Sequence, residues 1–172
     1  MQSFHCIKMV VTMNPCPCGY YPDRNKCRCT PYERHNYLSH LSGPILDRID
    51  ICVPVRKVDI EQLQSGEKGM SSERMREKVT EARRRQRERY QGTSYRFNAD
   101  LRSGDVEKYC ILGNGEKKLV EKLWHSMDFS ARTYHRMLKT ARTIADLLDE
   151  DHIREEHLMQ AACYRPGGLL ER

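Results

Sequence analysis

The 172-residue sequence lacks any apolar run that approaches the ~20 residues needed to cross a bilayer. Its amino-terminal segment is also a poor signal peptide, because Lys8 interrupts the apolar run there. We therefore expect a cytoplasmic protein with no membrane partner. Hydrophobic residues make up 38% of the chain and a single tryptophan is present, so the hydrophobic core is expected to be modest.

The sequence also lacks the phosphate-binding loop Gly-x-x-x-x-Gly-Lys-[Ser/Thr]. The nearest glycine cluster, at Gly113 and Gly115, has neither the spacing nor the hydroxyl that should touch magnesium. No acidic run at the end of an apolar strand stands in for a Walker B motif. The chain alone is therefore not expected to bind ATP tightly or to hydrolyse it.

Basic residues exceed acidic ones, 30 against 24, and the net charge of +6 favours polyanionic partners. Between residues 71 and 91 there are eight basic residues and four glutamates. A solvated helix with ion pairs four residues apart, such as Glu81 with Arg85, explains this pattern, and a stripe that contacts DNA phosphates is the alternative. The stripe would consist of Arg83, Arg84, Arg85, Arg87 and Arg89.

Four cysteines cluster in a polar loop as two Cys-x-Cys pairs separated by eight residues: Cys16, Cys18, Cys27 and Cys29. Such pairs can bring four thiolates around a tetrahedral zinc ion. The spacing departs from the usual Cys-x-x-Cys, and Pro15 and Pro17 remove backbone donors that could bond to sulfur. Zinc binding, reduced thiols in a loop and a disulfide remain as three interpretations. The scattered Cys6, Cys52, Cys110 and Cys163 are predicted to be core residues.

The predicted fold class is mainly α, a small helical bundle preceded by an incomplete α/β segment with one or two short strands. The strands are predicted at residues 7–13 and 51–55. Thr30 and Ser130 each have the sequence context of a helix N-cap, and Glu33 completes a capping box with Thr30. Ser71 and Ser72 open a further long helix.

Further helices are expected at 105–112, 116–127 and 153–165, with Trp124 in the core and Leu158, Ala161 and Ala162 facing inward. The helix that Ser130 begins is expected to bury Tyr134, Leu138, Ala141, Ala145 and Leu148 and to pair Arg142 with Asp146. In the helix opened by Ser71 and Ser72, Met75, Val79 and Ala82 recur at helical spacing.

Three motifs in order carry a family resemblance: Asn14-Pro-Cys-Pro-Cys-Gly19, Ser42-Gly-Pro-Ile-Leu-Asp-Arg-Ile-Asp50, and the stretch from Ser130-Ala-Arg132 to Leu147. They closely resemble the magnesium-chelatase-like ATPases of the ComM type, a branch of the AAA+ superfamily. The resemblance implies the C-terminal part of a ring-forming ATPase, with a helical lid of the AAA+ type and a link to DNA processing. It also implies ATP and Mg as cofactors of the full assembly and a missing phosphate-loop half as partner.

The resemblance assigns roles to three residues. Asn14 would be sensor 1, Arg48 the arginine finger that projects across a subunit interface, and Arg132 the sensor 2 residue that contacts the γ-phosphate. A plain ion-pair cluster of Arg48 with Asp47 and Asp50 is the alternative for the finger. None of the three candidate residues is a nucleophile or base, so the catalytic acid is expected in the missing half.

The expected organisation follows from the motifs: residues 1–57 as the C-terminal remnant of the nucleotide-binding domain, 58–70 as a linker, 71–166 as the lid, and 167–172 as a tail. The two strands lack their usual partners, so the lid is expected to be the stable unit. A second hypothesis competes with the ATPase fragment. It is a free-standing, zinc-containing adaptor that binds nucleic acid, suggested by the cysteines and the basic helix.

Overall fold

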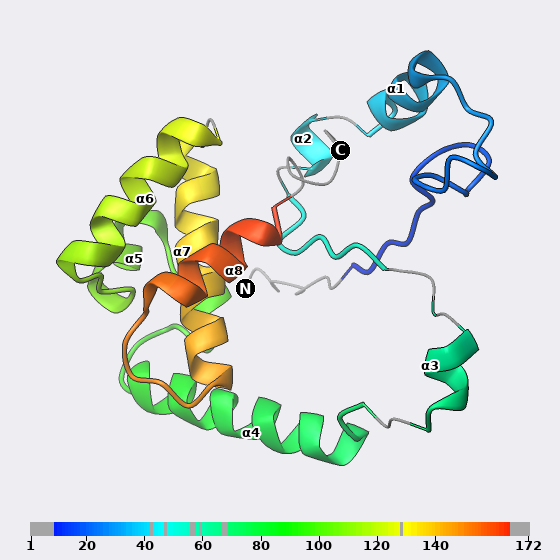
Figure 1. The fold of residues 1–172 in the computed structure, drawn as a ribbon. Coiled ribbons are helices and arrows are strands. Elements are labelled where there is room, and N and C mark those ends of the chain that lie inside the picture. Colours follow the sequence, from blue (N-terminus) through cyan, green and yellow to red (C-terminus); the bar gives the residue numbers. More distant parts are fainter. Residues whose placement is uncertain are drawn as a thin grey trace, which may run out of the picture. The chain divides into compact units, whose positions relative to one another are not determined.

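The computed structural model describes residues 9–41, 43–46, 48–55, 58, 60–66, 69–127 and 129–165. This part of the chain is mainly helical, which confirms the predicted fold class. It divides into two compact units, Met1–Leu46 and Asp47–Arg172, drawn in Figure 1.

The predicted short strands are absent from the described residues. Residues 9–13 and 51–55 are both irregular, and residues 7 and 8 of the first predicted strand lie outside the described part. A strand exists only when a neighbouring chain segment completes its hydrogen-bond ladder, and neither segment finds such a neighbour among the described residues. Their apolar side chains are accordingly exposed, Val10 by 93% and Val55 by 94%.

The first unit consists of a cysteine-containing loop followed by the helices α1 (Pro31–Ser39) and α2 (Gly43–Leu46). The predicted capping box is confirmed at the start of α1: Thr30 Oγ1 accepts from the Glu33 amide at 3.2 Å, and Glu33 Oε2 accepts from the Thr30 amide at 2.7 Å. No residue of α1 is buried. This helix therefore depends on its cap and on Pro31 rather than on a hydrophobic core.

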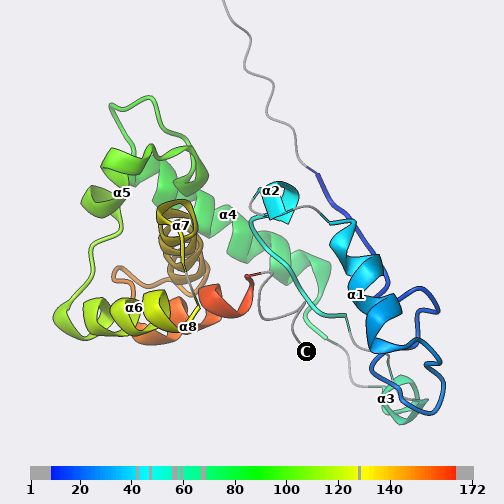
Figure 2. The same cartoon turned by 90° about the horizontal axis from the view of Figure 1, so that it is seen from above.

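The second unit is a helical bundle built around one central helix, α7. Its elements are α3 (Ile60–Gln64), α4 (Ser72–Arg89), the 3-10 helix η1 (Asn98–Asp100), α5 (Ser103–Tyr109), α6 (Asn114–Ser126), α7 (Ala131–Leu147) and α8 (Glu155–Cys163). Figure 2 views α7 almost end-on, with α4, α5, α6 and α8 arranged around it. The helix α7 packs against α4, α5, η1 and α8.

Two serines begin the long helices of the bundle. The Ser71 side chain accepts from the Arg74 amide at 3.3 Å, and the Ser130 side chain accepts from the Thr133 amide at 3.2 Å. The N-cap at Ser130 and the start of a long helix at Ser71 and Ser72 are confirmed as predicted from the sequence. Each capping serine satisfies a backbone donor that the first helical turn leaves without an intrahelical partner.

The hydrophobic core lies on the inner face of α7, where Met137, Leu138 and Ala141 are fully buried. Neighbouring elements contribute Leu101, Val106, Val120, Leu123, Phe129, Ile153, Leu158, Ala161 and Ala162. The predicted inward faces of α7 and α8 are thus largely confirmed.

Several predicted core residues are exposed instead. Trp124 is 37% exposed, with its ring edge on Tyr134, and Cys163 lies on the surface. Met75 and Val79 are 51% and 43% exposed, because the first half of α4 extends beyond its contact with α7 (Figure 1). The helical period was read correctly from the sequence, but period alone does not say where along a helix its neighbour ends.

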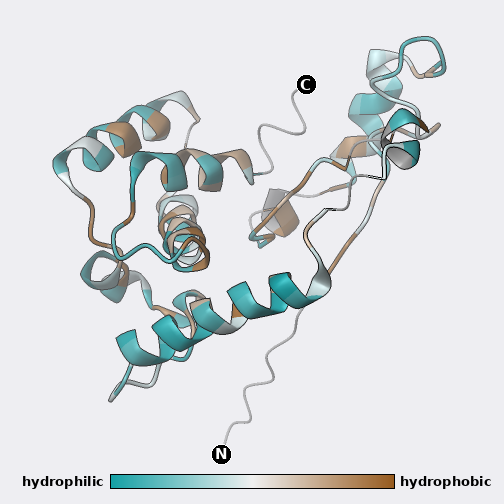
Figure 3. Ribbon diagram, turned by 60° about the horizontal axis from the view of Figure 1, so that its bottom comes forward, coloured by the Kyte–Doolittle hydropathy of each residue, from teal (hydrophilic) through white to brown (hydrophobic). Residues whose placement is uncertain are grey.

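A buried polar network fixes α4 against α7. Asp146, 1% exposed, accepts from Arg89, Arg142 and Asn98, which confirms the predicted Arg142–Asp146 pair. Arg142 also donates to the Asp151 carbonyl at 2.6 Å. Figure 3 shows α4 as the most hydrophilic of the long helices, so this network supplies contact that apolar packing does not.

Among the described helices, none combines the length and the apolar composition that a membrane span requires.

Candidate functional site

Four thiols converge in the loop of the first unit. The sulfur atoms of Cys16, Cys18, Cys27 and Cys29 all lie within 4.8 Å of one another. The Sγ atoms of Cys16 and Cys18 are 3.4 Å apart, those of Cys16 and Cys27 are 3.8 Å apart, and those of Cys18 and Cys27 are 3.6 Å apart. Four sulfurs around a tetrahedral zinc at 2.3 Å would be separated by about 3.8 Å. A disulfide would need about 2.05 Å, so the arrangement fits a metal better than a covalent bond.

Backbone donors support these sulfurs, contrary to the concern raised by the two prolines. The Tyr21 amide donates to Cys16 Sγ at 3.4 Å. A backbone hydrogen bond from Tyr20 lowers the pKa of Cys18 to about 6. The pKa of Cys29 is raised to about 12. A backbone hydrogen bond from Cys18 lowers this pKa, but the hydrogen bond with the Cys18 side chain and burial raise it by more. The Cys18 thiolate is therefore favoured, whereas the raised pKa values of Cys27 and Cys29 favour their protonated thiols.

Asn14 lies at the start of the same loop and its side chain is exposed. Gly19 forms a turn with Cys16 in this loop. The Gly19 amide donates to the Cys16 carbonyl at 3.0 Å, and Gly19 has a positive φ of 79°. A Cβ at Gly19 would lie 3.4 Å from Asn14 Nδ2, so the two residues of the motif are within contact distance of each other. Sequence reasoning did not connect Asn14 with Gly19, although both belong to one motif.

The other two candidate residues line one hollow in the second unit. Arg48 and Arg132 both border an open hollow of about 660 Å³, together with Ser103, Ala131, His135, Arg136 and Lys139. Arg132 lies in the first turn of α7 and its side chain is exposed. Cations converge here beside the amide groups of a helix N-terminus, which is an environment for an anion.

The lining cations Arg136 and Lys139 are hydrogen-bonded within the chain. Arg136 donates from Nε and Nη2 to Asp50 Oδ1 at 2.8 and 2.6 Å. Lys139 donates to the carbonyls of Ala99 and Leu101, and burial lowers the pKa of Lys139. Sequence reasoning missed Arg136 and Lys139. The available signal was their spacing, since Arg132, Arg136 and Lys139 follow one another at four and three residues on a single helix face.

The five arginines of the predicted stripe on α4 divide into two groups. Three are engaged inside the chain: Arg84 with Glu81 and Glu88, Arg85 with Asp149 and Asp151, and Arg89 with Asp146. The predicted ion pair of Glu81 with Arg85 is therefore not formed. Glu81 pairs with Arg84 instead, and Arg85 pairs with two aspartates in the loop after α7. Arg83 and Arg87 are exposed and form no ion pair with the residues that the structure describes, and the Arg83 guanidinium lies 6.0 Å from the centre of the Phe97 ring.

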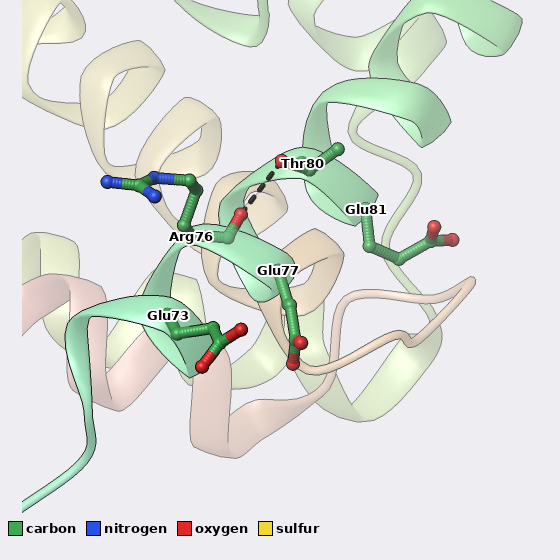
Figure 4. Close-up of a pocket in the computed structure, with 5 residues that line it drawn as sticks. All are labelled: Glu73, Arg76, Glu77, Thr80 and Glu81. Carbon is green, nitrogen blue, oxygen red and sulfur yellow. Dashed lines mark hydrogen bonds between the residues drawn. The ribbon is translucent and has the colours of Figure 1, made fainter.

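One face of α4 is acidic. Figure 4 shows a shallow hollow of about 460 Å³ lined by Glu73, Arg76, Glu77, Thr80 and Glu81. The three glutamates follow at four-residue spacing, and Thr80 donates its hydroxyl to the Arg76 carbonyl at 2.8 Å. Such a row of carboxylates repels phosphates.

A second group of potential metal ligands, Glu150, Glu156 and His157, is excluded by hydrogen bonding. His157 is fully buried and its Nδ1 accepts from the Arg154 amide at 3.1 Å. The proton of the neutral ring must then lie on Nε2, 3.8 Å from Glu150 Oε2, and a protonated nitrogen cannot bind a metal.

Comparison with protein families defines the class to which this helical bundle and its preceding segment belong. The family model described as magnesium chelatase, subunit ChlI C-terminal, matches residues 69–165. The model described as magnesium chelatase, subunit ChlI, matches residues 3–63. The chain belongs to the magnesium chelatase ChlI family, as its motifs indicate.

Individual relatives narrow this assignment to one branch. The chain is 39% identical over 159 residues to the competence protein ComM of Haemophilus influenzae, a match that covers 92% of this chain. It is 37% identical over 160 residues to YifB of Salmonella typhimurium and 36% identical to YifB of Escherichia coli. In each case the match covers 30% of the relative, so the chain spans about a third of the length of these curated relatives.

Proposed function

We propose that this chain supplies three residues to ATP hydrolysis in a ring-forming ATPase of the magnesium-chelatase type. Asn14 would act as sensor 1 and orient the attacking water, since an amide can both donate and accept. Arg48 would act as the arginine finger and Arg132 as sensor 2. The phosphate-loop half would be the partner that binds the nucleotide.

The observation that supports this proposal best is the hollow shared by Arg48 and Arg132. Two residues that line one hollow can approach the same phosphate group, so both would act on one nucleotide. If Arg48 reaches across a subunit interface, Arg132 then acts on the neighbouring subunit's nucleotide as well. Planar guanidinium groups suit the charge that develops on the transferred phosphoryl group.

The nucleotide and its magnesium ion supply the reacting phosphates and neutralise charge on them when bound. The chain's own residues have other tasks. The cations of the hollow attract and orient the terminal phosphate, and Lys139 adds charge beside Arg132, whereas Arg136 is already paired with Asp50. None of Asn14, Arg48 and Arg132 is a base, so we assign proton removal from water to the phosphate-loop half.

The test is a chimera in which this chain replaces the matching 159-residue stretch of Haemophilus influenzae ComM. We expect Arg48→Ala to lower kcat for ATP hydrolysis about 10³-fold or more. Arg132→Ala should lower it about 10²-fold, the cost of removing one donor to the transition state. Arg84→Gln, an arginine paired on the surface of α4, serves as the matched control and should change little. Equal rates in all variants would contradict the proposal.

We further propose that Cys16, Cys18, Cys27 and Cys29 hold one zinc ion. The separations of 3.4 to 3.8 Å among the sulfurs of Cys16, Cys18 and Cys27, with the Cys29 sulfur within 4.8 Å of all three, support this donor set. Elemental analysis of protein purified without chelator should find one zinc per chain. Cys16→Ser should abolish stoichiometric binding, and Cys163→Ser, an exposed cysteine outside the cluster, should retain it. No zinc in the unaltered protein, with unchanged loop NMR signals in Cys16→Ser, would overturn the proposal.

DNA is the polymer we propose for the basic edge of α4, through Arg83 and Arg87. The other three arginines of the predicted stripe are engaged within the chain. Replacing both Arg83 and Arg87 with Gln should reduce the slope of log K against log salt by about 1.8. The control, Arg84→Gln, removes a charge that is already paired and should leave the slope unchanged. An equal effect in both would assign the binding to net charge alone.

The zinc-containing nucleic-acid-binding adaptor remains the second candidate, favoured by the thiol cluster. The two functions predict opposite outcomes in the chimera. An adaptor would need zinc and the α4 edge for DNA binding, and Arg48 and Arg132 would be dispensable for any activity.

A further inference from the structure

The segment that carries Arg48 is fastened to the helix that carries Arg132. Asp50, two residues after Arg48, accepts two hydrogen bonds from Arg136, and Arg136 lies one turn after Arg132 on α7. The Arg136 side chain is only 14% exposed, whereas that of Asp50 is 73% exposed. Arg136 on α7 is thus the more buried partner, and the ion pair attaches the exposed segment around Asp50 to α7.

A second contact fastens the same segment further along. The Cys52 amide donates to the Tyr164 carbonyl at 2.8 Å, just beyond the end of α8. Residues 51–55 form no strand and have no other backbone ladder among the described residues. The segment that follows Arg48 is therefore attached at two points, one on α7 and one at the end of α8.

We propose that Asp50 is a positioning residue for Arg48. Its ion pair with Arg136 makes Arg48 and Arg132 move as one body, so that both reach the same neighbouring nucleotide together. This inference rests on the proposed function of Arg48 and Arg132. Its physical basis is preorganisation, because a finger already held in place loses less conformational freedom when it engages the phosphate.

The first test measures the attachment itself, without nucleotide, by hydrogen exchange of the Cys52 amide in the unaltered chain. Asp50→Asn and Arg136→Gln should each speed this exchange about two- to five-fold, the range expected for a partly exposed ion pair. Asp50→Glu keeps the carboxylate and should restore slow exchange. Arg74→Gln, on an exposed site of α4, is the control and should have no effect.

The second test asks in which subunit Asp50 acts, using mixed rings of the ComM chimera. Donor subunits carry an inactivated phosphate loop and an intact Arg48, and acceptor subunits carry an active phosphate loop and Arg48→Ala. Hydrolysis then occurs only where a donor finger meets an acceptor nucleotide. Asp50→Asn in the donor should lower kcat up to about five-fold with KM unchanged. The same substitution in the acceptor should have no effect.

Each outcome is decisive. Unchanged Cys52 exchange in Asp50→Asn would overturn the inference, because the pair would not hold the segment. Faster exchange with an equal loss of rate from donor and acceptor would also overturn it, since a merely structural defect acts in whichever subunit carries it. If Arg48→Ala in the donor does not lower the rate, the proposed function fails, and the exchange data still report on the attachment separately.

Discussion

Arg89 of α4 holds Asp146 of α7 with both of its terminal nitrogens, at 2.9 Å to Oδ2 and 2.5 Å to Oδ1. The carboxylate side chain is fully buried and also accepts from Arg142 and Asn98. Burial lowers the pKa of Arg142. Burial also acts to lower the pKa of Arg89, but the hydrogen bonds of Arg89 to Asp146 raise it overall. Because α4 has few apolar residues to bury, this charged group orients it on the bundle.

Asp146→Ala should destabilise the bundle strongly. It removes the acceptor that Arg89 and Arg142 share and leaves cationic groups buried without their partner, at a cost of ~3–5 kcal/mol. Glu88→Ala removes an exposed partner of Arg84 and should cost less than ~1 kcal/mol. Urea unfolding followed by circular dichroism measures both. Similar losses in the two variants would mean that the buried network does not carry the stability assigned to it.

Metal removal should affect the first unit alone. If zinc holds the four cysteines, a strong chelator will loosen residues 14–30, because this loop has few other contacts to order it. The bundle has its own core around Leu138 and should unfold at the same temperature with and without chelator. Hydrogen exchange resolves the two regions, with the slowest amides expected near Leu123 and Leu138. A drop in the bundle's unfolding temperature would contradict this separation.

Local signals were the part of this structure that the sequence predicts well. The caps at Thr30, Ser71 and Ser130 each depend on one side chain and one backbone amide a few residues away. Such pairs do not need the rest of the chain. The inner face of α7 also followed from its period, because this helix has neighbours on several sides.

Features that depend on distant contacts were not predictable in the same way. The strands at 7–13 and 51–55 were predicted from β-propensity, which measures fit to a sheet rather than the presence of one. The exposure of Trp124 depends on how far the neighbouring elements extend along α6. The link between Asp50 and Arg136 joins residues 86 positions apart, and no pattern in the sequence marks it.

Gly19→Ala should weaken the metal site through the backbone. Gly19 has a φ of 79°, and an alanine in this left-handed region costs ~1–2 kcal/mol, or roughly tenfold in zinc affinity if the bound loop needs this conformation. The new methyl group would also meet the Asn14 amide, so the Asn14 side-chain NMR signals should shift. Gly92→Ala is a matched control, with a φ of 78° and open space around it. Its zinc affinity should equal that of the unaltered chain.

The start of α1 should loosen in acid. A hydrogen bond from the Thr30 backbone, aided by the Thr30 hydroxyl, holds the pKa of Glu33 below its ordinary value of 4.5. A carboxylate with a lowered pKa stabilises the folded form above its unfolded pKa, and this contribution is lost as the pH falls through the folded value. NMR signals of the Thr30 and Glu33 amides should therefore change below about pH 4.5. In Glu33→Gln, which can still form the box, this transition should vanish.

The chain by itself should bind magnesium ATP only weakly. The hollow offers the cations Arg48, Arg132 and Arg136, but Asp50 already neutralises Arg136, and the chain has no phosphate loop to wrap the phosphates with backbone amides. Calorimetric titration should therefore show no micromolar affinity.

Inorganic triphosphate at low salt should still shift the NMR signals of His135 and its neighbours. This ligand carries the phosphate charge of ATP without the adenine base or the ribose, so it tests the attraction of the cations alone. Arg132→Ala should abolish that shift and Arg84→Gln should preserve it. Micromolar affinity for magnesium ATP would show that a cradle exists in this chain after all.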